Sequence, residues 1–272
     1  MINKKSKLAQ QFYETGRACP IYDFHGHMHE FASGYLPRHS SAKMIGLMNR
    51  ANVKLMVFCS HNALFLTGYE LEKNRDETKL FPEKLRAYHG IISRLTNFED
   101  FFANMENNPD VYVGAKFLCD YNTTPLSSEA HKPFFQYLNE HSMLVLLHTW
   151  GGSPYNGPAE VERAAKNYPG ITFVCGHSFH GEWGAGAALA KKYPNLYYEL
   201  TATHDDYGVI EFLTANVSSE RILFGTDLPW FSTYVGIGSV LAADISDDDR
   251  ENIFFRNAWR LSEKHAWIKE FM

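Results

Sequence analysis

Two histidines, His25 and His27, stand at the end of the first apolar run, in the segment Ile21-Tyr-Asp-Phe-His-Gly-His-Met-His29. Side chains two residues apart on a β-strand point to the same side of the sheet, so both imidazoles are available to one metal ion. Three later apolar runs also end in a group able to bind a divalent cation, namely His148, His177 and Asp227. The fold must therefore bring the ends of these runs together.

Short apolar runs alternate with helix-like segments along the whole chain, which is typical of repeated β-α units on a parallel sheet. We expect eight strands, at 20–24, 54–60, 85–93, 111–119, 143–148, 171–176, 196–200 and 221–225. The run at 85–93 also fits a helix. Helix-like segments lie near 42–50, 98–107, 128–141, 159–167, 184–192, 207–216 and 247–267.

The length of 272 residues matches an α/β barrel, which occupies about 250 residues as one domain. The sequence predicts a single-domain (β/α)8 TIM-like barrel over residues 1–272, with 1–19 as an N-terminal extension. The polar segment 62–82 follows the second expected strand, where barrels place active-site loops. It is either a lid or an idle surface excursion.

Composition and charge narrow the choice of partner and compartment. The net charge is −5 and no extended basic patch exists, which argues against nucleic acid. No segment has the length and apolar character of a membrane span or a signal peptide, so we expect no membrane association and a cytoplasmic location. We expect a small molecule as substrate, and a homo-oligomer is compatible with the sequence.

In a parallel barrel the carboxyl ends of the strands meet on one face, where active sites are built. The expected ligands all lie there. The segments Asp23-Phe-His-Gly-His27, Leu146-Leu-His-Thr-Trp-Gly151, Cys175-Gly-His177 and Phe224-Gly-Thr-Asp-Leu-Pro229 resemble successive motifs of the amidohydrolase superfamily. Within it, the chain resembles the amidohydrolase-related family that includes aminocarboxymuconate-semialdehyde decarboxylase.

The resemblance runs from about residue 20 to about residue 260 and implies a distorted (β/α)8 barrel. It implies one metal ion bound by His25, His27, His148 and Asp227. His177 would lie beside the metal and contact the substrate or the bound water. Lys116, in Gly114-Ala-Lys116, is either the carboxylated bridge of a two-metal site or, as we favour, a buried ion-pair or substrate-carboxylate partner in a one-metal site.

These residue types suit definite chemistry. Imidazole and carboxylate ligands favour zinc, with manganese and iron as alternatives. A bound metal lowers the pKa of water from about 15.7 towards 7, which provides hydroxide at neutral pH. Asp227 can take and return its proton, and His177 can polarise a carbonyl or stabilise an oxyanion.

Further polar and aromatic residues follow the expected strands and are candidates for substrate contact. His61 and His204 lie on the predicted catalytic face. Trp150 and Trp230 form either an aromatic pocket wall or ordinary loop packing. Arg38 is a carboxylate clamp or a solvated arginine, and His180 is a supporting loop residue or a substrate contact.

Three functions fit the sequence. The first is hydrolysis of a small amide, lactone or ester by metal-activated water. The second is nonhydrolytic decarboxylation of an unsaturated or aromatic carboxylic acid. The third is a catalytically idle barrel that binds metal, since a fold alone does not establish activity. Asp227 argues against the third, because a degenerate site would be expected to lose its proton-transfer residue first.

Overall fold

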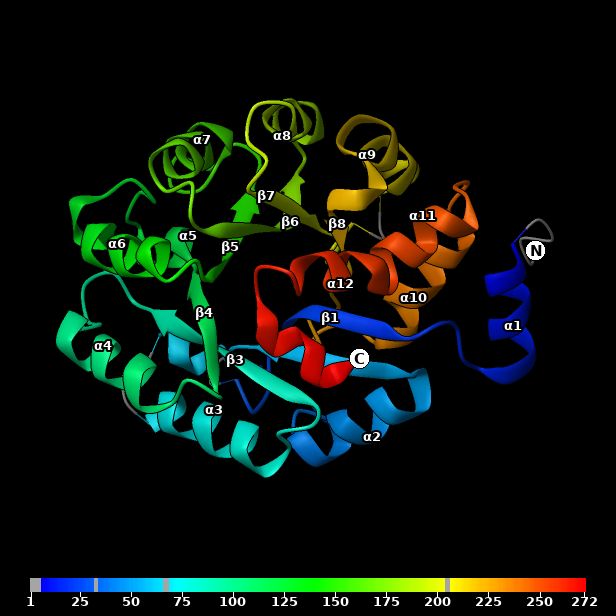
Figure 1. Cartoon of the computed structure of the whole chain (residues 1–272), viewed down its shortest axis with the longest axis horizontal. Coiled ribbons are helices and arrows are strands. Elements are labelled where there is room, and N and C mark those ends of the chain that lie inside the picture. The colour runs from blue at the N-terminus through cyan, green and yellow to red at the C-terminus, as the bar shows by residue number, and fades with distance from the viewer. Residues whose placement is uncertain (1–5, 32–33, 66–68, 204–205) are drawn as a thin grey trace.

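The computed structural model describes residues 6–31, 34–65, 69–203 and 206–272. Eight parallel strands follow one another in sequence order around a barrel, and helices surround it (Figure 1). The ring closes where the first strand meets the last: the Phe24 amide donates to the Phe224 carbonyl at 3.0 Å, and the Asp227 amide to the His25 carbonyl at 2.8 Å. The predicted (β/α)8 TIM barrel is confirmed.

All eight expected strands are present, including the ambiguous run at 85–93. The strands are β1 (Ile21–Gly26), β2 (Val53–Phe58), β3 (Leu85–Ile91), β4 (Tyr112–Phe117), β5 (Leu144–Trp150), β6 (Thr172–His180), β7 (Leu196–Glu199) and β8 (Ile222–Leu223).

The helices that surround the barrel are α1 (Lys7–Thr15), α2 (Ser41–Ala51), α3 (Tyr69–Leu80), α4 (Phe98–Asn107), α5 (Cys119–Asn122), α6 (Lys132–Glu140), α7 (Pro158–Asn167), α8 (Trp183–Ala190), α9 (Val209–Val217), α10 (Thr233–Ala242), α11 (Asp247–Glu251) and α12 (Asn257–Leu261). Shorter turns are the 3-10 segments η1 (Asn62–Leu64), η2 (Glu129–His131), η3 (Ser219–Arg221) and η5 (Ala266–Phe271), and the π-helical turn η4 (Asn252–Arg256).

The helices differ from the expectations in three respects. The segment 62–82 is largely helical, because η1 and the helix α3 occupy most of its described part. The helix expected at 247–267 is continuous over α11, η4 and α12, with a π-helical turn at η4, but it ends at Leu261. Helices α1 and α10 were not expected. Ser6 is the N-cap of helix α1, and its hydroxyl accepts from the Ala9 amide at 3.0 Å.

Alternation along the strands divides the core into two clusters. Leu55 and Val57 of β2 pack with Leu144 and Leu146 of β5. Their sequence neighbours, among them Met56 and Val145, belong instead to the cluster that contains most of the buried helix residues. Successive strand residues point to opposite faces, so one cluster fills the barrel and the other seals it against the helices.

The C-terminal segment η5 covers one end of the barrel and lies in front of β1 in Figure 1. The Tyr22 hydroxyl at the start of β1 donates to the Phe271 carbonyl at 2.9 Å. Arg86, near the start of β3, pairs with Glu270 and lies 4.6 Å from the centroid of the Phe271 ring. The amino ends of β1 and β3 are therefore covered by η5.

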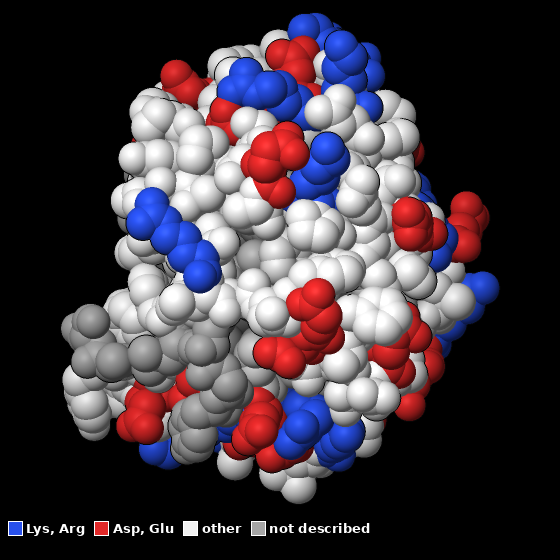
Figure 2. Space-filling model, turned by 90° about the vertical axis from the view of Figure 1, so that its left-hand side faces the viewer, with Lys and Arg blue, Asp and Glu red and all other residues white. Residues whose placement is uncertain are grey.

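In the residues that the structure describes, no helix combines the length and the apolar character needed to cross a membrane. On the face in Figure 2, lysine and arginine side chains are interspersed with aspartate and glutamate. This face therefore carries no continuous basic surface.

Candidate metal centre

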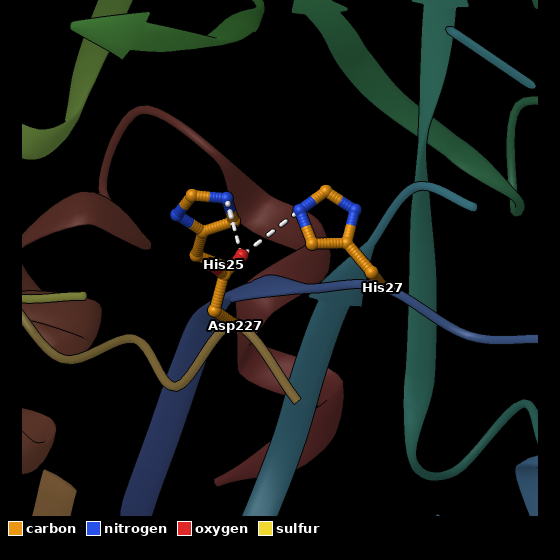
Figure 3. A group of neighbouring side chains, drawn as sticks. All are labelled: His25, His27 and Asp227. Atoms are coloured by element: carbon orange, nitrogen blue, oxygen red, sulfur yellow. Dashed lines mark ion pairs between the residues drawn. The ribbon is translucent and has the colours of Figure 1, made fainter. Parts of the chain in front are cut away.

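Three of the expected ligands converge at the carboxyl end of the barrel (Figure 3). The Asp227 Oδ1 atom lies 3.0 Å from His27 Nε2 and 3.3 Å from His25 Nε2. Ligand atoms of the three residues all lie within 4.8 Å of one another. Asp227 Oδ1 is buried and makes no hydrogen bond within the described structure. An unsatisfied buried oxygen between two imidazole nitrogens fits a divalent cation.

Each of the two histidines is oriented through its other nitrogen. His25 Nδ1 lies 2.8 Å from Glu199 Oε2, and His27 Nδ1 lies 2.6 Å from the Cys59 carbonyl. These acceptors place the ring proton on Nδ1 in both cases, an assignment made from the hydrogen-bond network. The Nε2 lone pairs are thus directed toward Asp227. Such contacts behind the ligands are typical of metal-binding histidines.

Glu199, at the end of β7, is a site residue that the sequence analysis missed. It is fully buried, and besides His25 it accepts hydrogen bonds from the His177 amide at 3.3 Å and the Thr201 amide at 2.6 Å. The Thr201 hydroxyl donates to it as well. The signal was present in the sequence, because Glu199 is the one charged residue in the run 196–200.

Two glycines leave room for these groups. A Cβ atom at Gly225 would lie 1.9 Å from Glu199 Oε1, and one at Gly176 would lie 3.2 Å from the His25 ring and 2.7 Å from the Leu147 carbonyl. Both glycines belong to the motifs Cys-Gly-His177 and Phe-Gly-Thr-Asp227. Their conservative replacement by alanine would therefore displace the carboxylate or the imidazole.

Asp23 is the second acidic residue without a predicted role. Its carboxylate accepts from the His25 amide at 3.1 Å and from the Thr226 amide and hydroxyl at 3.2 and 2.6 Å. Burial raises the pKa of Asp23 to about 7, although the hydrogen bonds from Thr226 oppose this shift. Asp23 thereby ties β1 to the loop that carries Asp227.

Lys116 reaches the same centre from β4. Its Nζ atom lies 2.9 Å from His25 Nε2, and the side chain is buried. Burial lowers the pKa of Lys116 to about 8, although the nearby Asp227 carboxylate raises it. The predicted role of Lys116, as a buried ion-pair or substrate-carboxylate partner rather than a carboxylated bridge, stays a prediction.

His177 and His148 form a pair on the neighbouring strands β6 and β5. His177 Nε2 lies 3.0 Å from His148 Nδ1, and His177 Nδ1 lies 3.2 Å from the Thr201 carbonyl. His148 borders the same pocket as His27 and Asp227, but it is not in the group whose ligand atoms lie within 4.8 Å of one another. Its predicted role as fourth metal ligand stays a prediction, as does the role of His177.

The backbone at His177 has positive φ angles, which are uncommon for residues other than glycine. His177, Ser178 and Phe179 have φ angles of 65°, 49° and 61°, and such left-handed positions cost about 1–3 kcal/mol each. Two hydrogen bonds hold the turn: the Ser178 hydroxyl donates to the Glu199 carbonyl at 2.8 Å, and the Phe179 amide to Thr149 Oγ1 at 2.9 Å. Strain of this kind is concentrated at functional sites.

Burial controls the charge of the imidazoles. It lowers the pKa of His25 and His148 well below the usual value, and that of His177 to about 4. Neutral rings keep the lone pairs that a metal requires. Burial also raises the pKa of Glu199 to about 8, against the hydrogen bonds from Thr201. A cation at His25 would reverse that shift, because bound ions dominate local electrostatics.

A pocket of about 260 Å³ opens above these groups, and we call it the mouth pocket. Its lining residues are mostly aromatic: His27, Phe31, His61, Phe65, Lys116, Leu118, Tyr121, His148, Trp150, His177, Ala202, Asp227, Trp230 and Phe231. The His61 ring stacks on His27 with centroids 3.8 Å apart and an interplanar angle of 11°. His61, Trp150 and Trp230 thus border the mouth pocket, and for the two tryptophans this position fits the pocket-wall alternative; their contact with substrate stays a prediction.

His180 and Arg38 do not border the mouth pocket. His180 stacks on Trp150 at 4.2 Å between centroids, and its Nε2 lies 2.9 Å from Asp206 Oδ2. Arg38 is exposed and also does not line the pocket. His204 lies outside the described residues, so its predicted position stays untested.

Comparisons with known proteins agree with this architecture. A TIM-barrel protein from Bordetella bronchiseptica is similar at 20% identity and a TM-score of 0.75, over 91% of this chain and 100% of that one. A dihydroxybenzoic acid decarboxylase from Polaromonas with bound manganese and an inhibitor has 14% identity and a TM-score of 0.67, over 90% and 97%.

A 4-oxalomesaconate hydratase from Rhodopseudomonas palustris has 15% identity and a TM-score of 0.66, over 92% of this chain and 98% of that one. At these identities the likeness concerns the fold. No curated protein sequence matches the chain. The sequence model of a family described as amidohydrolase matches residues 86–261. With the barrel and the histidine and aspartate cluster in place, this match means that the chain belongs to the amidohydrolase family and is a metal-dependent enzyme of that superfamily.

Proposed function

We propose that the site binds one divalent cation through His25, His27 and Asp227, with His148 as the fourth ligand. Zinc is our first choice, and manganese and iron suit the same nitrogen and oxygen donors. The unsatisfied Asp227 Oδ1 between two Nε2 atoms supports the proposal. One ion is favoured over two because the Glu199 oxygens already accept hydrogen bonds from Thr201 and His25.

We further propose that the reaction is decarboxylation of a small, planar, unsaturated or aromatic carboxylic acid. The observation that carries this choice is the mouth pocket. Phe31, Phe65, Tyr121, Trp150 and Trp230 wall it, and Lys116 is the one lysine or arginine among its described lining residues. A pocket of about 260 Å³ is smaller than the roughly 300–1,000 Å³ typical of drug-sized ligands. It suits a flat ring with one anionic group.

The aromatic lining of the mouth pocket also favours a reaction in which the substrate loses its carboxylate charge. Aromatic faces pack well against a planar conjugated substrate. They solvate a carboxylate poorly, so departure of neutral carbon dioxide relieves an unfavourable burial. In this reaction the carbon–carbon bond breaks, its electron pair stays on the substrate carbon, and a proton is added there. The substrate anion is thus converted into a neutral gas and a C–H bond.

The chain supplies the groups for this chemistry. A bound cation would orient and polarise the oxygen atoms of the substrate. Asp227 and His177 both border the pocket, and one of them must carry the proton to the substrate carbon. Lys116 offers a positive charge to the carboxylate. The Glu199 and Cys59 contacts keep His25 and His27 in one tautomer throughout.

Hydrolysis of an amide, lactone or ester is the second candidate. The His148–His177 pair favours hydrolysis. His177 Nε2 lies 3.0 Å from His148 Nδ1, so the two imidazoles can pass a proton from water toward a leaving group. The sequence alone ranks hydrolysis first. The aromatic lining of the mouth pocket supports decarboxylation instead.

Two assays on zinc-loaded and manganese-loaded protein test the proposal. The first measures carbon dioxide release from a panel of hydroxylated benzoic and unsaturated acids. The second follows hydrolysis of esters, lactones and amides in water enriched in heavy oxygen. We expect carbon dioxide in a one-to-one ratio with substrate loss, and turnover about 10²–10⁴-fold lower in Asp227→Asn. Heavy oxygen in the product without carbon dioxide release would establish hydrolysis and refute decarboxylation.

A further inference from the structure

The lone pair of His25 Nε2 can be used by the Lys116 ammonium or by a metal ion, but not by both. His25 Nδ1 carries the ring proton because it faces Glu199 Oε2 at 2.8 Å, so Nε2 is an acceptor only. Lys116 Nζ lies 2.9 Å from that Nε2 atom. A lysine ammonium donates and cannot accept. The hydrogen bond from Lys116 therefore uses the electron pair that a metal ion at His25 and Asp227 would need.

We propose that Lys116 and the divalent cation exclude each other at His25 Nε2: the lysine holds the metal-free site, and metal binding releases it to bind an anion in the mouth pocket. The exclusion does not depend on which reaction is catalysed. The second half, the anion subsite, rests on the proposed function.

The surroundings of Lys116 determine what the released ammonium can bind. His25 Nε2 is its one hydrogen-bond acceptor among the described residues. The side chain is 1% exposed, yet it belongs to the lining of the mouth pocket. A buried ammonium without an acceptor is unfavourable. Once the metal has taken Nε2, an anionic ligand in the pocket is the group that can satisfy it.

Repulsion between the Lys116 ammonium and the divalent cation also lowers the affinity of the metal-free site for metal. The Lys116 ammonium lies 2.9 Å from Nε2 of His25, which belongs to the proposed ligand set. Like charges a few ångströms apart in a buried site interact strongly. The lysine should therefore weaken metal binding in the absence of substrate, and an anion should restore it. Metal and anion would bind cooperatively, with the same coupling in both directions.

The first experiment measures zinc affinity of metal-free protein by competition with a chelator, for wild type and Lys116→Met. Methionine keeps much of the length and removes the charge. We expect zinc to bind about tenfold more tightly or better, because a modest part of the cation repulsion already amounts to that factor. The matched control is Lys192→Met, which removes an equal charge from an exposed lysine paired with Glu162. Its zinc affinity should equal that of wild type.

Unchanged or weaker zinc binding by folded Lys116→Met would overturn the exclusion. Loss of a second zinc equivalent in this variant, together with a bicarbonate requirement in wild type, would also overturn it and make Lys116 a carboxylated bridge. If the variant does not fold, the nitrogen signal of the Lys116 ammonium in wild type gives a second test. It should shift when zinc is added, and a signal that does not respond would contradict the exclusion.

The second experiment uses benzoate as the anion probe, measured by calorimetry without turnover. Zinc-loaded wild type should bind benzoate, metal-free wild type should not, and zinc-loaded Lys116→Met should bind it about tenfold more weakly. Equal benzoate affinity in the two loaded proteins would overturn the anion subsite. Benzoate binding without any carbon dioxide release from the acid panel would instead refute only the proposed decarboxylation.

Discussion

The Glu199 carboxylate makes a sharp prediction about metal affinity. It accepts from four donors: His25 Nδ1, the His177 amide, and the amide and hydroxyl of Thr201. Glutamine in its place keeps the size but replaces one oxygen by an NH2 group, which donates. In Glu199→Gln a donor must therefore face either Thr201 or His25. Facing His25, it would favour the tautomer that carries the proton on Nε2, where the metal should bind.

The magnitude follows from two independent considerations. Leaving one buried donor unsatisfied costs about 1–3 kcal/mol. Mutation of a group that orients a metal-binding histidine typically lowers metal affinity by about 10–100-fold, or about 1.4–2.8 kcal/mol. The ranges overlap, so Glu199→Gln should weaken zinc binding by about 10–100-fold. Chelator competition measures the affinity, and circular dichroism checks that the barrel is folded.

The matched control is Thr201→Val, which removes one donor to Glu199 but leaves the carboxylate on His25 Nδ1. Its zinc affinity should stay within about threefold of wild type. The lost hydrogen bond contributes only about 0.5–1.5 kcal/mol, and Thr201 contacts Glu199 rather than the proposed metal ligand His25. If folded Glu199→Gln binds zinc as tightly as Thr201→Val, Glu199 does not orient His25.

Three further predictions concern single residues. Asp227→Asn should reduce turnover by about 10²–10⁴ while retaining most of the metal, because the amide oxygen can still coordinate but cannot carry a proton; elemental analysis with steady-state kinetics checks this, and near-normal turnover would remove Asp227 from proton transfer. His177→Ala should stay folded and metal-bound but lose about 2.7–4 kcal/mol of transition-state stabilisation; isolation of a metal-free variant would make His177 a required ligand. His265, buried beside Thr172, has a pKa lowered by burial to about 3. The unfolded chain therefore binds more protons than the native protein between about pH 6.5 and 3, and stability falls on acidification through this window. Urea unfolding should give His265→Gln a shallower pH dependence, by up to about 1.4 kcal/mol per pH unit, and an unchanged slope would refute this assignment.

The sequence predicts the barrel because its strands are short apolar runs with a regular rhythm. Even the ambiguous run at 85–93 is a strand, since every residue of β3 is buried. The helix α3 escaped prediction because its exposed face is strongly polar and its apolar positions are few. The helix expected at 247–267 is continuous only as far as Leu261, and it contains a π-helical turn at Asn252–Arg256. Such a turn has no simple sequence signal.

The meeting of His25, His27 and Asp227 at one place was predictable because strand ends of a parallel barrel meet at one face, whichever residues lie between them. The residues that orient the ligands were not. Glu199 was hidden because an acidic residue in a short strand is ordinarily read as exposed, whereas here it lies beneath His25. Likewise the left-handed turn at His177 is held by tertiary hydrogen bonds from Ser178 to β7 and from Phe179 to β5. Local sequence does not encode such contacts.

Asp23 connects the closing of the barrel with the assembly of the site. Its carboxylate receives hydrogen bonds from the His25 amide in β1 and from Thr226 beyond β8. The backbone bond from Asp227 to His25, at 2.8 Å, lies beside them and joins two of the proposed ligands directly. The contacts that close the ring therefore also fix the relative position of His25 and Asp227. Since those contacts require no metal, the ligands are preorganised, and metal binding should add to the stability of an already folded barrel by mass action rather than induce its folding.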